Sequence, residues 1–67
     1  MLTITVNGQK RSVTEGTSVK ALLLDLALQP EATVVERNSD ILDRSQFDSI
    51  LLCDGDALEL VRFVGGG

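Results

Sequence analysis

The 67-residue sequence contains no histidine and only one cysteine, Cys53. Histidine is the commonest general base and the commonest metal ligand in proteins. The sequence therefore lacks the usual residue of general-base active sites and of metal sites. A single cysteine forms no disulfide within its own chain and supplies no cysteine-based metal site. With no histidine to activate its thiol, Cys53 is expected to be a structural residue that fills space in the fold.

Aromatic residues and long apolar runs are also scarce. Phe47 and Phe63 are the only aromatic residues, so the core is expected to consist of leucine, isoleucine and valine. No apolar run exceeds four residues, as in the segment 21–24, which is far too short to cross a bilayer. The first residues lack the basic stretch and the long apolar segment of a signal peptide. We therefore expect one soluble, cytoplasmic domain without membrane contact.

The sequence has fewer basic than acidic residues. Six Lys and Arg residues stand against ten Asp and Glu residues, which gives a formal net charge of −4. An acidic surface repels the phosphate backbone of nucleic acids. Lys10 and Arg11 form the one adjacent basic pair in the sequence, so no nucleic-acid partner is predicted.

A hairpin is predicted at the start of the chain. The segment 2–6 alternates apolar and polar residues, which is typical of a half-buried strand. Asn7-Gly8 follows and favours a type I′ turn, because both central residues of that turn need a positive φ. Residues 9–14 then form the predicted return strand.

One main helix is predicted after the hairpin, with Ser18 as its N-cap residue. Leu24 is expected to be partly exposed, and Leu28 is expected to pack under the helix end. Pro30 is expected to end the helix, because the residue before a proline avoids the α region. The apolar face of this helix is formed by residues spaced i, i+3, i+4 and i+7, namely Val19, Leu22, Leu23 and Leu26.

The second half of the sequence predicts strands separated by turns. Residues 33–37 form a strand, residues 41–42 a short edge strand, and residues 57–63 the last strand. A helical turn at 45–48 is expected to place Phe47 on the core. A hairpin, a helix and further strands indicate an α+β fold, a mixed sheet of four to five strands with the helix on one face.

The last strand is expected to lie in the centre of the sheet, beside the first strand. Residues 1–64 then form the folded domain, and residues 65–67 form a flexible tail.

No internal catalytic or metal site is predicted. Asp54-Gly55-Asp56 lacks the further ligands of a calcium loop and is typical of a turn. The glycines at positions 8, 16 and 55 are not followed by the Lys-Ser/Thr pair of a phosphate loop.

The last strand has two faces with different residues. If Leu58 and Leu60 face the helix, the period of two directs Val61 and Phe63 to the open face of the sheet. Scattered apolar residues are normal on protein surfaces, but a pair next to a glycine tail also fits a docking patch. The residues alone leave both interpretations open.

The glycine tail, Gly65-Gly66-Gly67, also has two interpretations. Terminal residues are often disordered and without a role. A tail without side chains can, however, thread a narrow channel, and the carboxylate of Gly67 becomes reactive once a partner enzyme activates it. Because no other part of the sequence offers catalytic chemistry, the tail is the candidate functional site.

Four stretches carry a resemblance to a known family. Three are individually weak: Val6-Asn7-Gly8, Glu15-Gly16-Thr17-Ser18-Val19 and Val35-Glu36-Arg37-Asn38. The fourth is specific, because Asp-Gly-Asp, an apolar strand and a Gly-Gly end follow one another in residues 54–67. Together they resemble β-grasp, ubiquitin-like sulfur carriers, most closely the thiamin-biosynthesis sulfur-carrier (ThiS) family, over nearly the whole chain.

The resemblance implies a carrier protein and not an enzyme. An adenylating enzyme of the ubiquitin-activating type, using ATP and magnesium, would activate Gly67, and a sulfur-transfer protein would help convert its carboxylate to a thiocarboxylate. Thiazole synthase would then take the sulfur. Gly65 and Gly66 would thread the tail, Val61 and Phe63 would dock on partners, and the free chain would be a monomer that binds no cofactor.

The chain departs from the family pattern after its third strand. Family members often carry Asn-Gly-x-Ile-Val-Pro-Arg there, whereas residues 38–44 read Asn-Ser-Asp-Ile-Leu-Asp-Arg. Alternative functions stay open at this point. They are a sulfur carrier for molybdopterin, for cysteine or for other sulfur metabolism, a ubiquitin-like protein modifier, and a plain binding module with a frayed end.

Overall fold

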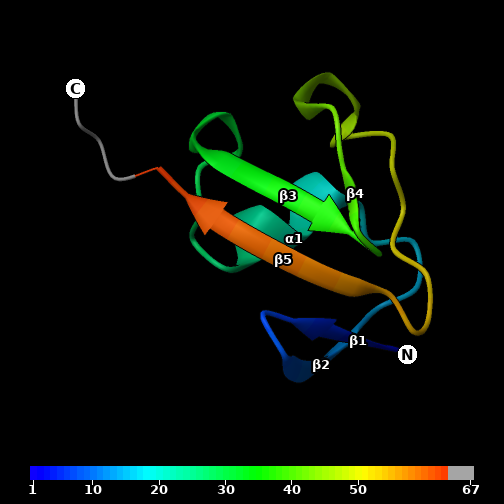
Figure 1. The fold of residues 1–67 in the computed structure, drawn as a ribbon. Coiled ribbons are helices and arrows are strands. Elements are labelled where there is room, and N and C mark those ends of the chain that lie inside the picture. Colours follow the sequence, from blue (N-terminus) through cyan, green and yellow to red (C-terminus); the bar gives the residue numbers. More distant parts are fainter. Residues whose placement is uncertain (64–67) are drawn as a thin grey trace.

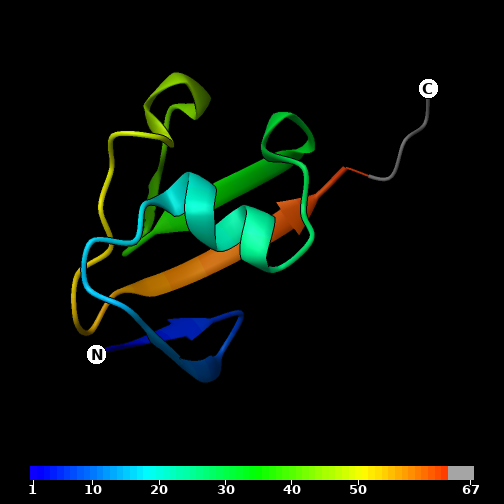
Figure 2. The ribbon, with the colours of Figure 1, turned by 180° about the vertical axis from the view of Figure 1, so that it is seen from behind.

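The structure is a computed structural model that describes residues 1–63. Five strands form one sheet, and the helix α1 crosses one face of it (Figures 1 and 2). Two short 3-10 turns, η1 (Pro30–Ala32) and η2 (Arg44–Gln46), lie in the connections. The main elements are β1 (Leu2–Val6), β2 (Gln9–Val13), α1 (Val19–Asp25), β3 (Thr33–Arg37), β4 (Asp40–Ile41) and β5 (Ala57–Arg62).

The sheet has the strand order β2-β1-β5-β3-β4. β5 runs parallel to β1 and antiparallel to β3, so the sheet is mixed. The last strand of the sequence therefore lies in the centre beside the first strand, and this confirms the predicted α+β arrangement. The N-terminus and the end of β5 lie at opposite ends of the sheet (Figure 1).

The turn between β1 and β2 has the predicted geometry. Asn7 has φ 50° and Gly8 has φ 83°, the two positive values that a type I′ turn requires. The turn sets the register in which Leu2 lies opposite Val13. Since directly opposed residues share a face, this register places the apolar residues of both strands toward the helix.

A similar turn joins β3 to β4. Asn38 has φ 51° and Ser39 has φ 76°, so neither central residue is a glycine. Asparagine tolerates this left-handed region better than most residues, whereas serine adopts it less readily. β4 begins at Asp40, one residue earlier than predicted, and ends at Ile41.

Helix α1 begins as predicted. The Ser18 hydroxyl accepts a hydrogen bond of 3.0 Å from the backbone N–H of Ala21, which satisfies one of the free donors of the first turn. Val19, Leu22 and Leu23 are at most 1% exposed, so the predicted apolar face is the buried one.

The prediction that Pro30 ends the helix is wrong. α1 ends at Asp25, and Ala27 adopts φ 60° beyond it. The N–H of Leu28 donates to the carbonyl of Leu23 at 2.8 Å, and the N–H of Ala27 donates to that of Leu24 at 3.0 Å. These two bonds form a Schellman motif, which normally uses glycine where this chain has Ala27, so no residue at this point predicts the end of the helix.

The segment between β4 and β5 is anchored by η2. Asp43 Oδ1 accepts hydrogen bonds from the backbone N–H and the hydroxyl of Ser45, and these bonds hold the pKa of the Asp43 carboxyl below its usual value. The turn places Phe47 on the core with 2% exposure, as predicted.

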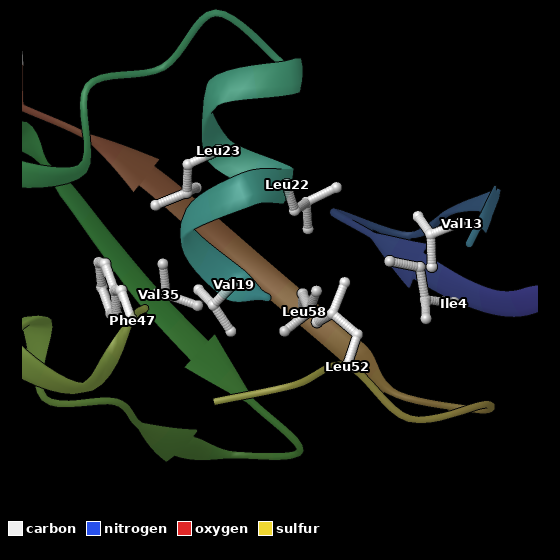
Figure 3. Packing of buried hydrophobic residues seen from close by; sticks show 9 residues of the cluster. All are labelled: Ile4, Val13, Val19, Leu22, Leu23, Val35, Phe47, Leu52 and Leu58. Atoms are coloured by element: carbon white, nitrogen blue, oxygen red, sulfur yellow. The ribbon is translucent and has the colours of Figure 1, made fainter. Parts of the chain in front are cut away.

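The core lies between α1 and the sheet and is almost entirely aliphatic. Figure 3 shows Val19 of α1 between Val35 and Leu58, with Phe47 beside Val35. The buried cluster consists of Ile4, Val13, Val19, Leu22, Leu23, Val35, Phe47, Leu52 and Leu58.

Cys53 is not part of this core. Its side chain is exposed, so the expectation that it fills space is wrong. Its backbone N–H donates to Asp56 Oδ2 at 2.8 Å, so Cys53 contributes to the turn through its backbone and not through its side chain. The apolar neighbour that is buried is Leu52, at 4% exposure.

Two neighbouring leucines of α1 offer a matched test of the core. Leu23 is fully buried, whereas Leu24 is 57% exposed. The substitution Leu23→Ala is expected to lower the free energy of unfolding by about 2–5 kcal/mol, because it removes buried contacts and leaves a cavity. Leu24→Ala on the same helix should change it by less than about 0.5 kcal/mol in urea unfolding. Equal losses in the two variants would contradict the assigned helix face.

Candidate functional site

The acidic turn before β5 is a structural element. Asp54 Oδ1 accepts a hydrogen bond of 2.7 Å from the backbone N–H of Thr3. The Asp56 side chain is buried, and its Oδ1 accepts from Asn38 Nδ2 at 3.1 Å. Asp56 Oδ2 also lies 3.6 Å from Arg37 Nη1. Both carboxylates are thus engaged within the fold, as expected of a turn and not of a calcium loop.

The described residues show neither a metal cluster nor an unpaired buried polar group. Within residues 1–63, no group of three or more His, Cys, Asp or Glu side chains is placed to hold a metal ion. Every buried side-chain nitrogen or oxygen there has a hydrogen-bond partner. None of the helices in this range is long and apolar enough to span a membrane.

Asn7 holds β5 from the first hairpin turn. Its backbone N–H donates to the carbonyl of Leu58 at 2.8 Å. Its side-chain Oδ1 accepts from the N–H of Leu60 at 2.8 Å, and its Nδ2 donates to the carbonyl of Leu60 at 3.4 Å. β1 itself pairs with β5 only at Thr5 and Val6, so the Asn7 side chain extends the contact along β5.

Asn38 holds the start of β5 from the other hairpin turn. Its backbone N–H donates to the carbonyl of Ala57 at 2.8 Å, and its side-chain Oδ1 accepts from the N–H of Ala57 at 2.9 Å. Asn7 and Asn38 thus bind β5 from the turns of the two hairpins that flank it. We call these two side chains the asparagine clamps.

Sequence reasoning missed both asparagine clamps. It assigned Asn7 and Asn38 to turns, which explains their backbone conformation but not their side chains. A glycine would also satisfy a positive φ, whereas an asparagine adds one donor and one acceptor. The use of asparagine instead of glycine was the one signal in the sequence that the side chain has a partner. Leu60 lies 53 residues after Asn7, so only the fold reveals that partner.

The two faces of β5 differ as predicted. Leu58 is 1% exposed, whereas Val61 is 59% exposed and Phe63 is 57% exposed. The N–H of Phe63 donates to the carbonyl of Ala32 at 2.8 Å, which continues the β3–β5 ladder by one residue. The period of two therefore places Phe63 on the same open face as Val61.

A third apolar residue shares this open face. Val34 of β3 lies directly opposite Val61 of β5 and is half-buried. We call Val34, Val61 and Phe63 the open-face patch. It lies at the end of β5 from which the tail begins. The docking interpretation requires an exposed apolar surface next to the tail, and the patch lies there. Its role in docking on partners stays a prediction.

The tail itself lies outside the described residues. The predicted carrier residue Gly67 and the predicted threading residues Gly65 and Gly66 are all in this part of the chain, as is the predicted boundary between domain and tail. The structure places the strand that leads into them and the last described residue, Phe63.

Comparisons with known proteins agree on one family. The family model described as the ThiS family matches residues 4–67. The sulfur carrier protein ThiS of Bacillus subtilis is 38% identical over 50 residues, which cover 75% of this chain and 76% of that protein. A crystal structure of the thiamine biosynthesis protein (ThiS) from Geobacter metallireducens has a TM-score of 0.82 at 40% identity, covering 98% of this chain and 100% of that one. This likeness confirms the β-grasp fold.

A longer relative contains a segment of the same kind. The thiazole synthase of Paramagnetospirillum magneticum is 38% identical to this chain over 64 residues, which cover 96% of this chain. The chain spans 20% of the length of that relative. A sequence of this type therefore also occurs within a longer polypeptide.

The asparagine clamps predict a specific mutant effect. Asn7→Gly keeps a residue that tolerates the positive φ but removes both side-chain bonds to Leu60. We expect it to lower the free energy of unfolding by about 1–2 kcal/mol and to speed amide hydrogen exchange at Leu60. Ser39→Gly is the matched control, because Ser39 also has a positive φ and makes no described side-chain hydrogen bond. Unchanged exchange at Leu60 in Asn7→Gly would argue against the clamp.

Proposed function

The chain belongs to the ThiS family, and on that premise we propose that it is a sulfur carrier for thiamin biosynthesis that holds sulfur on its last residue, Gly67. The carboxylate of Gly67 is the reactive group, and partner enzymes supply the catalysis. The chain acts as a substrate that is loaded, passed on and unloaded.

Loading proceeds in two steps. A carboxylate is a poor electrophile, so an adenylating enzyme first joins it to the α-phosphate of magnesium-bound ATP and releases pyrophosphate. A persulfide on a sulfur-transfer protein then attacks the acyl carbon and displaces AMP. A thiol attacks the sulfur of the sulfur-transfer protein in the resulting S–S bond, forms a disulfide with it and expels the thiocarboxylate of Gly67. The net change replaces one carboxylate oxygen by sulfur.

The observation that carries this proposal is the arrangement at the end of β5. Val61 and Phe63 are exposed on the open face, in a strand whose path is held by hydrogen bonds from both flanking turns. An apolar pair next to the tail supports docking, because exposed aromatic side chains are preferred anchors of protein interfaces. Three glycines without side chains then favour entry of the tail into a narrow channel.

The acceptor of the sulfur is proposed to be thiazole synthase. The relative from Paramagnetospirillum magneticum, which carries that name, includes a segment like this chain within one polypeptide. Joining a carrier to the enzyme that unloads it would raise the effective concentration of the pair. This occurrence supports thiazole synthase as the partner that takes the sulfur from Gly67.

Intact mass spectrometry tests the loading step. The chain is incubated with ATP, magnesium, the cognate adenylating enzyme and a persulfide source, and its mass is expected to rise by about 16 Da, the difference between sulfur and oxygen. A chain lacking Gly67 should show no gain and should keep the melting temperature of the wild type. Conjugates to lysines of other proteins would indicate a protein modifier. An unchanged mass while the enzyme loads an established carrier would reject the proposal.

The docking role has its own test. Phe63→Asp introduces a charge into the open-face patch and is expected to weaken binding to the adenylating enzyme by about tenfold or more, with an unchanged fold. Leu24→Asp is the matched control, because Leu24 is also 57% exposed but lies on the helix. Calorimetric titration measures both variants. Equal affinities for Phe63→Asp and Leu24→Asp would contradict docking through Phe63.

A further inference from the structure

A groove lies on the helix side of β5, opposite to the open-face patch. It is formed where the tip of the β1–β2 hairpin and the end of α1 both approach the end of the sheet from which the tail leaves (Figure 2). Its volume is about 380 Å³. We call it the hairpin–helix groove. Its apolar floor is formed by Val6, Leu26, Leu28 and Leu60.

The floor is partly open to solvent. All four floor residues are half-buried and pack against the core cluster from its edge. An occupant with an apolar side chain would therefore complete their burial, which is favourable at about 25 cal/mol per Å² of apolar surface removed from water. A simple anion would gain nothing from this floor.

The rim of the groove is basic in an acidic protein. Arg11 and Arg62 line it on the helix side, and no Asp or Glu lines it. Lys10 also borders the groove, but it lies opposite Thr5 and alternates with Gln9 and Arg11, so its side chain belongs to the open face. Two smaller hollows of about 290 and 270 Å³ on the described surface do include aspartates, at Asp25 in one and at Asp54 and Asp56 in the other. Among the three, the groove is the one without an acidic residue in its lining.

Both helix-side cations can meet a partner. Arg62 makes no ion pair with any residue in the range 1–63. Arg11 Nη2 binds Asp25 Oδ2 at 3.1 Å, and both side chains of this pair are exposed, so the pair contributes little to stability. An occupant that carries carboxylates would thus find Arg62 free and Arg11 held only by an exposed ion pair.

Arg62 ties the groove to the base of the tail. It lies opposite the buried Thr33 in the β3–β5 ladder, so it alternates with Val61 and Phe63 and belongs to the helix side. A protein that encloses the tail must surround this end of β5. It would meet the open-face patch on one side and the hairpin–helix groove on the other.

We propose that the hairpin–helix groove binds an acidic, amphipathic segment of the enzyme that activates the tail. An apolar side chain of that segment lies on the leucine and valine floor, and its carboxylates pair with Arg11 and Arg62. The adenylating enzyme therefore contacts β5 on both faces, at the open-face patch and at the hairpin–helix groove. This inference rests on the proposed carrier function and adds a second contact surface to it.

Charge reversal at the groove tests this inference. The double variant Arg11→Glu/Arg62→Glu is compared with Lys20→Glu/Arg44→Glu, which has the same net charge but alters exposed residues outside the groove. Binding to the adenylating enzyme in the presence of ATP is expected to weaken by about tenfold or more for the groove variant and by less than about threefold for the control. Circular dichroism of each variant checks the fold.

The single variant Arg11→Glu separates the groove from the open-face patch. Arg11 lies opposite Ile4 on the edge strand β2, on the helix side of the sheet, so its reversal leaves Phe63 and the path of β5 unaltered. It is expected to weaken binding by about threefold and to flatten the dependence of affinity on salt. Equal affinity of wild type, Arg11→Glu and the groove double variant would overturn the inference.

Crosslinking identifies the occupant directly. A photo-crosslinking residue at position 9, where Gln9 lines the groove, is expected to capture a segment of the enzyme that contains Asp or Glu next to an apolar residue. Capture of a segment without acidic residues would reject the groove inference. If the wild type gains sulfur yet charge reversal has no effect, only the groove inference fails. If the enzyme neither binds nor modifies the wild type, the carrier function fails and the groove inference fails with it.

Discussion

The path of β5 is held by its ladder to β3 on one side and by hydrogen bonds from two asparagine side chains in the turns of the flanking hairpins. The parallel pairing between β1 and β5 covers only two residue pairs, so it does not reach the second half of the strand. Asn7 adds the contact at Leu60, and Asn38 fixes the start of the strand at Ala57. The antiparallel ladder to β3 then guides the strand as far as Phe63.

With the path of β5 fixed, the alternation of its side chains separates two surfaces. Val61 and Phe63 lie on the open face, and Arg62 lies on the helix side between them in sequence. Both surfaces meet at the end of β5, and no group of three or more His, Cys, Asp or Glu side chains within residues 1–63 is placed to hold a metal ion.

The sequence was sufficient for features that depend on local patterns. Asn7-Gly8 predicted the first turn, the apolar stripe predicted the buried face of α1, and the parity of Val61 and Phe63 predicted their exposure. Prediction from the sequence failed where a tertiary contact or an unusual backbone conformation determines the structure. Ala27 ends the helix in the left-handed region that glycine normally occupies, and the partner of the Asn7 side chain is distant in sequence.

The shortness of β4 has a consequence for how this protein meets others. An edge strand with free backbone groups can recruit a strand from a second molecule, which leads to tight and slowly reversed association. β4 is only two residues long, and the opposite edge strand β2 carries Lys10 and Arg11. Neither edge is a good template for strand addition. Contacts are then left to the faces of the sheet, where side chains alone decide affinity, and a complex formed in this way is expected to dissociate faster than one formed by strand addition.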